Sequence, residues 1–191
     1  MSEPKQIATL PPLEELHGAV PLSRRTGEPR RPVVLVVAAV LLQLAAVGAM
    51  GAYAWHWWLA AHPASYGRSA WLIGWTDPAP GKWLSLTLEV ALAAALALAA
   101  GAAGIAGFQA WNGWRWARWA GLVALALMGG FLALTHWYAA MPVGLTLMGA
   151  GLLFLPAVSR YFTQWAEVRG QRPQPYRRPE QILYGRLPRF R

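Results

Sequence analysis

The feature that most restricts the fold is an apolar run in the middle of the chain. From Val90 to Phe108 there are 19 consecutive residues without a polar side chain. A helix needs about 20 such residues, each rising about 1.5 Å, to cross the hydrocarbon core of a bilayer. The run therefore predicts a membrane-spanning helix, and any further core must be built around it.

One ionisable residue, Glu89, directly precedes this run. In a helix it shares a face with small residues, and small residues allow neighbouring membrane helices to approach closely. A charged group inside a span avoids lipid, so we expect Glu89 to turn towards neighbouring helices. The other residues of this expected face are Ser85, Ala93, Ala97, Ala100, Gly104 and Gly107.

The whole chain has the composition of a membrane protein. Of its 191 residues 56% are hydrophobic and 13% are charged, which favours a single all-α domain: a polytopic integral membrane protein built as a four-transmembrane-helix bundle. A signal peptide cleaved after Ala54 is the alternative for the first span, but its leader is longer than such peptides have. The predicted spans are about 33–55, 83–108, 119–138 and 142–163, between a tail at 1–32, an outer loop at 56–82 and a basic tail at 164–191.

The positive charges predict how the chain is threaded. Fifteen Lys and Arg residues lie in the two tails and the 109–118 hairpin, whereas the two opposite loops hold only Arg68 and Lys82. By the positive-inside rule both termini are cytoplasmic. The strong preference for Arg over Lys and the abundance of Ala and Gly suggest a GC-rich bacterial genome, so we expect a multi-pass protein of the bacterial cytoplasmic (inner) membrane.

Two local features refine this picture. A short apolar segment at 69–75, with Trp71 and Trp75, is too short to span and is expected to lie on the membrane surface. Pro156 lies inside the fourth predicted span, where the missing N–H should kink the helix.

Three residues near the outer side are candidates for binding or chemistry. An intramembrane carboxyl such as Glu89 is typical of a proton acceptor or an ion ligand; alternatively it is protonated, reaches the interface, or pairs with Lys82 or Arg68. His56 and His136 end different spans at similar depth, as two haem ligands would. The absence of cysteine and of a zinc-binding histidine motif argues against a metal site. No catalytic residue is expected, and haem b or a quinone is kept as the alternative to a chain without a cofactor.

The C-terminal tail carries aromatic and aliphatic residues between its arginines. Basic groups adsorb to anionic lipids, but adsorption alone does not require the apolar residues, so we expect the end of the tail to dock on a partner subunit or a lipid-covered groove. Nucleic acid is not expected, because positive-inside anchoring accounts for the charge. The expected partner-binding residues are Pro179, Ile182, Leu183, Tyr184, Arg186, Leu187 and Phe190.

These observations favour a non-catalytic accessory or assembly subunit of a larger membrane complex, of the energy-converting type. The alternative is a small transporter, channel or redox anchor that uses Glu89 and the outer histidines. A conducting path needs polar groups along its whole length. Only Gln43 lies near mid-membrane, which weighs against the alternative.

Overall fold

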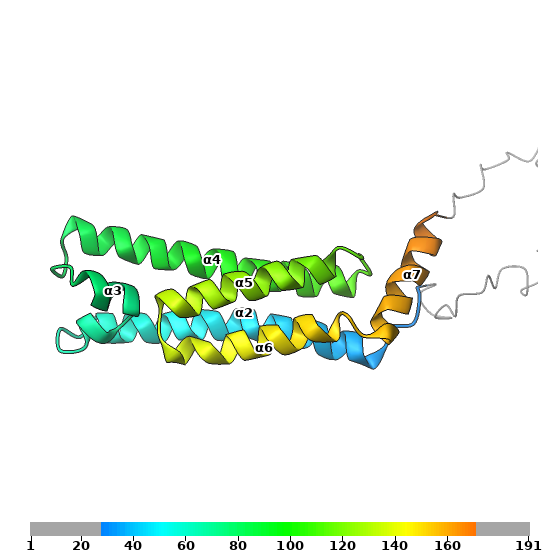
Figure 1. Cartoon of the computed structure of the whole chain (residues 1–191), viewed down its shortest axis with the longest axis horizontal. Helices are drawn as coiled ribbons and strands as arrows, with labels where there is room; N and C mark the ends of the chain where they lie inside the picture. The colour runs from blue at the N-terminus through cyan, green and yellow to red at the C-terminus, as the bar shows by residue number, and fades with distance from the viewer. Residues whose placement is uncertain (1–27, 171–191) are drawn as a thin grey trace, which may run out of the picture.

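The computed structural model of the chain describes residues 28–170, and within this part all regular structure is helical. Four long segments form the bundle and three short ones join or extend it (Figure 1). In chain order the elements are α2 (Val33–Ala60), η1 (Tyr66–Arg68), α3 (Trp71–Thr76), α4 (Trp83–Trp111), α5 (Ala117–Leu134), η2 (Trp137–Ala139), α6 (Ala140–Leu152) and α7 (Pro156–Gly170).

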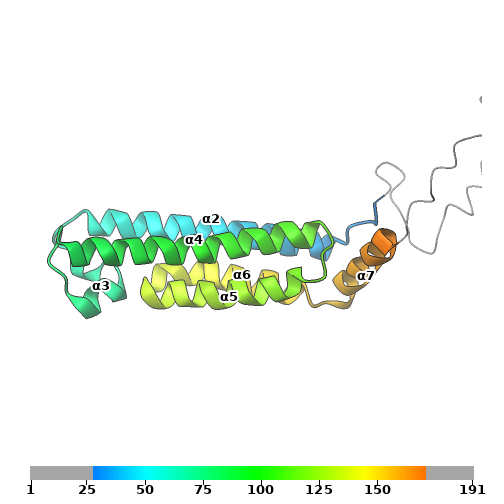
Figure 2. The same cartoon turned by 90° about the horizontal axis from the view of Figure 1, so that it is seen from above.

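The bundle is a closed ring of four antiparallel helices. α2 packs against α4 and α6, and α5 packs against the same two helices from the other side. Each helix runs opposite to the one before it, so the described chain begins and ends at one end of the bundle (Figures 1 and 2). We call this the α7 end, and the opposite end, where α3 lies, the α3 end.

Three of the helices, α2, α4 and α5, are long and apolar enough to cross a membrane. The first two predicted spans are confirmed as helices, but each continues beyond its predicted end, to Ala60 and to Trp111. α5 stops at Leu134, four residues before the predicted end of the third span. It stops there because the next residue, Thr135, leaves the helical conformation, and its side chain donates a hydrogen bond back to Phe131 O at 2.6 Å.

The fourth predicted span is not one kinked helix. α6 and α7 are separated by a short break and bent by 63° relative to each other, so they form a span only if the two are counted together. Pro156 is the first residue of α7, where its missing N–H costs no helical hydrogen bond. The prediction placed the proline correctly but underestimated its effect, because a turn at 153–155 joins the helices.

Small residues let the helices of the bundle approach closely. A Cβ added at Gly149 on α6 would lie 2.9 Å from Leu42 Cγ, and one at Gly107 on α4 would lie 3.2 Å from Ala39 O. The predicted small face of α4 is confirmed at Ser85 and Gly107, which are buried, but is wrong at Ala97, which is exposed. The face rotates because residues seven apart on a helix drift by about 20° per heptad.

The segment expected on the membrane surface packs inside the α3 end instead. Ile73 is fully buried in a cluster with Leu92 of α4, and the N–H of Trp71 donates to Thr135 O at 2.7 Å. Because α5 is 18 residues long and α4 is 29, α5 leaves a space beside the longer helix. α3 lies beyond the end of α5 in both cartoons and fills this space (Figures 1 and 2).

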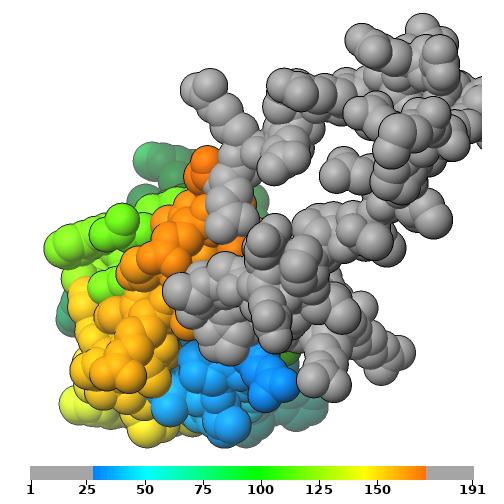
Figure 3. Space-filling model, turned by 90° about the vertical axis from the view of Figure 1, so that its right-hand side faces the viewer, coloured from blue at the N-terminus to red at the C-terminus, as the bar shows by residue number. Residues whose placement is uncertain are grey.

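At the opposite end, α7 passes across the bundle and binds the α4–α5 turn (Figure 3). Tyr161 donates its hydroxyl hydrogen to Trp111 O at 3.0 Å, and Trp165 contacts Gly113. Arg169 donates to the carbonyls of Asn112 and Gly113. α7 is therefore anchored to the bundle by backbone acceptors of the turn.

Candidate functional site

The candidate site lies at the α3 end and centres on His56. Its side chain is fully buried, because α2 continues past the predicted end of the first span and keeps His56 inside the helix. Ala45, Ala49 and Ala52 precede it on the buried face of α2, at the spacing that places residues on one side of a helix. The imidazole thus occupies a position that a core residue would otherwise fill.

His56 pairs with Glu89 across the α2–α4 interface. Its Nε2 lies 2.9 Å from Glu89 Oε2, and the Glu89 side chain is 15% exposed. The expectation that Glu89 turns inward is therefore confirmed. The suggested pairing with Lys82 or Arg68 is wrong, because the first turns of α4 direct the carboxyl towards α2 instead.

The second ring nitrogen fixes the proton count of this pair. His56 Nδ1 lies 3.1 Å from Ser69 O, and because a carbonyl only accepts, Nδ1 must carry a hydrogen. One further proton must then lie between Nε2 and Oε2, since two bare acceptors would repel each other at 2.9 Å. The pair therefore holds one shared proton and has no net charge.

Ser69 also connects His56 to the segment after α5. Its carbonyl accepts a second hydrogen bond, from the Tyr138 hydroxyl at 2.6 Å. The ring of His136 stacks on Tyr138 with ring centroids 5.7 Å apart and lies beside Trp71. The two histidines predicted to lie at similar depth are thus at the same end, but Tyr138 and Ser69 stand between them.

A small cavity opens beside the pair. It has a volume of about 180 Å³, and Glu89 and Tyr66 are among the residues that line it. Glu89 Oε1 and the Tyr66 hydroxyl are buried and have no hydrogen-bond partner within residues 28–170. Such orphaned polar atoms in a native interior call for a further partner, so the site can accept a small polar group. The remaining lining residues are Trp57, Ala60, Ala61, Pro80, Gly81, Ser85 and Leu86.

The geometry bears on the haem and metal alternatives. Both ring nitrogens of His56 already have partners, so it would have to release one of them to ligate an iron. Among the described residues no group of three His, Cys, Asp or Glu side chains is arranged to hold a metal ion. Within this part of the chain the arrangement is one for hydrogen bonding and for holding a proton.

A second feature lies on the lipid-facing surface between α2 and α4. Gln43 is exposed there, near the middle of α2, and its Nε2 donates to Gly104 O at 3.2 Å. An otherwise apolar groove of about 290 Å³ surrounds the amide. The sequence indicates that Gln43 lies at mid-membrane but not which way it faces. The groove is lined by Ala39, Val40, Leu44, Val47, Gly107, Phe108 and Trp111.

Sequence reasoning missed several parts of the site at the α3 end. Ser69 acts through its backbone carbonyl, which carries no sequence signal. Tyr66 and Tyr138 each lie within a few residues of a candidate histidine or its contacts, and a search for hydroxyls near buried ionisable groups would have found them. The seven expected partner-binding residues of the tail, from Pro179 to Phe190, lie outside the described residues.

The comparisons with known proteins assign no function to these features. Protein-family profiles, curated proteins and solved structures were each searched with the chain, and none of them matches it. The functional argument therefore depends on the geometry of the chain itself.

Proposed function

We propose that this chain is a non-catalytic subunit of a larger complex in the bacterial cytoplasmic membrane. In this proposal its groove between α2 and α4 receives a transmembrane helix of a partner protein. The exposed amide of Gln43 carries the proposal. A polar side chain that faces lipid at mid-membrane is costly, and such side chains commonly bond across helix–helix contacts instead.

The surroundings of Gln43 support a helix as the occupant. Gly104 and Gly107 lie beside it on α4, and small residues allow a further helix to approach closely. Gln43 Nε2 already donates to Gly104 O, and an amide has a second N–H and an acceptor oxygen to offer. A partner helix with one polar side chain at this depth would satisfy both.

The groove can be tested by site-specific photo-crosslinking in intact cells. A photoreactive residue at Val40, which lines the groove and is 49% exposed, should give a covalent adduct with another membrane protein. Val123 is 56% exposed and lies on α5, away from the groove, so it is the matched control. Equal adducts at both positions, or an adduct only with a second copy of this chain, would contradict the proposal.

The amide itself is tested by Gln43→Leu. Interhelical hydrogen bonds in membranes contribute about 0.6 kcal/mol on average, so this variant should fold and insert normally. It should nevertheless lose the partner during purification in mild detergent, because the partner's polar group would be left unsatisfied. Full partner recovery with Gln43→Leu would exclude the amide as the recognition element.

We further propose that four segments cross the membrane and that both chain ends are cytoplasmic. The distribution of charge supports this orientation, because the α7 end carries most of the described arginines and the α3 end carries only Arg68 and Lys82. The basic residues described at the α7 end are Arg30, Arg31, Arg115, Arg118, Arg160 and Arg169.

The orientation can be measured directly, because the chain contains no cysteine. A single cysteine replacing Lys82 should react with a membrane-impermeant maleimide in intact cells. A single cysteine replacing Arg160 should react only after the membrane is permeabilised. The reverse pattern would show that the orientation is inverted.

The second candidate is a redox anchor or transporter that uses the pair at the α3 end. The unpartnered Glu89 Oε1 and Tyr66 hydroxyl beside the cavity favour it. If this candidate is correct, the chain purified from its own membrane should carry a Soret band or a solvent-extractable quinone. Glu89→Gln and Tyr66→Phe should each lower the amount bound, and a wild-type chain without either cofactor would argue for the subunit alone.

A further inference from the structure

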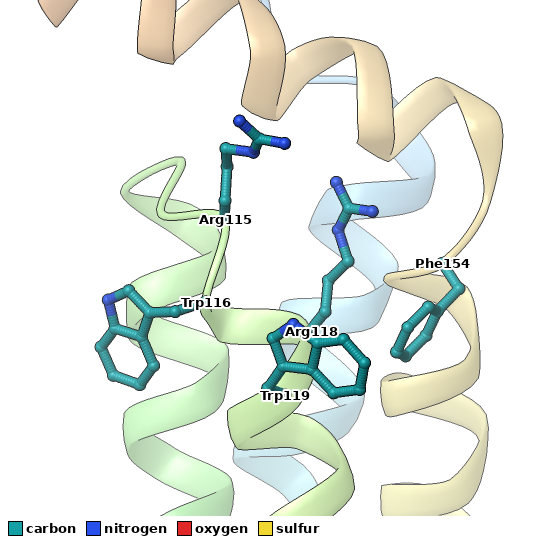
Figure 4. Close-up of a pocket in the computed structure, with 5 residues that line it drawn as sticks. All are labelled: Arg115, Trp116, Arg118, Trp119 and Phe154. Carbon is teal, nitrogen blue, oxygen red and sulfur yellow. The ribbon is translucent and has the colours of Figure 1, made fainter.

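A second cavity lies at the α7 end, far from the His56–Glu89 pair. It has a volume of about 300 Å³ and lies between the start of α5 and the α6–α7 bend. Figure 4 shows the guanidinium groups of Arg115 and Arg118 both directed towards α7. Trp119 and Phe154 lie below them with ring centroids 6.3 Å apart, and Trp116 completes the lining.

The two guanidinium groups have no acidic partner in the described chain. Within residues 28–170 the ion pairs are those of Arg31 with Glu28 and of His56 with Glu89. Arg118 Nε is buried and has no hydrogen-bond acceptor among these residues. A buried donor without an acceptor, beside a second cation, calls for an anion in the cavity.

The position of Arg118 is fixed by packing. Its guanidinium carbon lies 5.1 Å from the centre of the Phe162 ring on α7, within the range of a cation–π contact. The bend between α6 and α7 thus places an aromatic face against one arginine and leaves Arg115, three residues earlier, exposed at the mouth. The positive charge is held at the cavity without being neutralised.

The cavity also lies at a defined depth. Trp116, Trp119 and Phe154 are all exposed, and they adjoin the apolar parts of α5 and α6. Exposed tryptophans at the end of an apolar helix mark the headgroup level of a bilayer. Charge on the α7 side and aromatic rings on the bundle side match the two halves of a phospholipid, its phosphate and its acyl chains.

We infer that this cavity binds the headgroup phosphate of an anionic phospholipid, with Arg115 and Arg118 donating to its oxygens and the acyl chains lying against Trp119 and Phe154. Guanidinium groups match phosphate geometry well, and basic pockets between membrane helices bind anionic headgroups. No acidic residue lines the cavity, so it has nothing to attract the amine of a zwitterionic lipid. The inference is independent of the proposed subunit role.

The test is a lipid titration of the purified full chain in a non-ionic detergent, followed by native mass spectrometry. Phosphatidylglycerol is compared with phosphatidylcholine of the same acyl chains. The double variant Arg115→Gln, Arg118→Gln should bind phosphatidylglycerol about thirtyfold more weakly, since each basic group near an anionic lipid contributes about a factor of five. The matched control is Arg68→Gln, Lys82→Gln, which removes the same charge from the α3 end and should bind as the wild type does.

Further measurements separate the possible results. Arg115→Gln alone changes an exposed side chain and should lower affinity about fivefold, so the inference stays testable if the double variant misfolds. Equal loss in the control variant would mean that net charge alone attracts the lipid, and equal binding of phosphatidylcholine would remove the headgroup preference. Competition by soluble glycerol phosphate at the same concentration would show a site for free phosphates. Any of these three results would overturn the inference.

Discussion

The shared proton of the His56–Glu89 pair leads to an unequal prediction for its two members. In Glu89→Gln the amide keeps the size of the carboxyl and can donate an N–H to His56 Nε2, while His56 Nδ1 still donates to Ser69 O. The number of hydrogen bonds is unchanged, so the free energy of unfolding should fall by about 1 kcal/mol or less. His56→Ala instead leaves the carboxyl without its partner and empties a fully buried position. It should cost about 3 to 5 kcal/mol, the range for breaking a buried pair.

Unfolding in mixed micelles, with the denaturing detergent as the variable, measures both variants on one scale. Glu89→Ala is the third member of the series and should fall between them, because it leaves His56 Nε2 unpartnered but creates less empty space. Tyr138→Phe serves as a control, since Ser69 O would retain the bond from His56. If Glu89→Gln proved as damaging as His56→Ala, the pair would be held together by full charges and the shared-proton argument would be refuted.

Two glycine pairs test the packing of the fold in the same detergent system. Gly149→Ala places a Cβ 2.9 Å from a leucine of α2 and should destabilise by about 1 to 3 kcal/mol, whereas Gly151→Ala on the same helix meets nothing within 4 Å and should not lower the melting temperature. Gly113→Ala combines a φ of +73° with a clash against Trp165 and should detach α7, seen as faster trypsin cleavage within α7. Gly81→Ala has a φ of +74° and nothing within 4 Å, so it measures the backbone strain alone; similar cleavage of α7 in both variants would contradict the role of Trp165.

The helices themselves follow from the sequence because the bilayer accepts so few alternatives. A long apolar run must satisfy its backbone hydrogen bonds internally, and in one segment only a helix does so. This argument predicted α2 and α4 well. It overestimated α5 and α6, because their last residues remain apolar after the helix has ended. Hydropathy registers the apolar residues but not the local hydrogen bond of Thr135 or the turn before Pro156.

The candidate residues were recognisable one at a time, but their relations were not. An ionisable residue within or beside an apolar span is conspicuous, so Glu89 and His56 could both be singled out. Their pairing depends on how α2 and α4 are rotated, and that rotation is set by close contacts such as Gly107 against Ala39. The same rotation turns Gln43 outward, which no count of polar residues along the chain reveals.

What the sequence alone determined is the solvent in which this chain folds, the apolar segments that enter it and the end of the bundle where positive charge gathers. These follow from length, hydrophobicity and charge, which act locally along the chain. Only the tertiary structure decided that α3 fills the space beyond α5, that α7 lies across the bundle, and that Arg115 and Arg118 share a cavity with Phe154. Those outcomes depend on contacts between residues distant in sequence, and side-chain shape at each helix crossing selects among packings of nearly equal hydrophobicity.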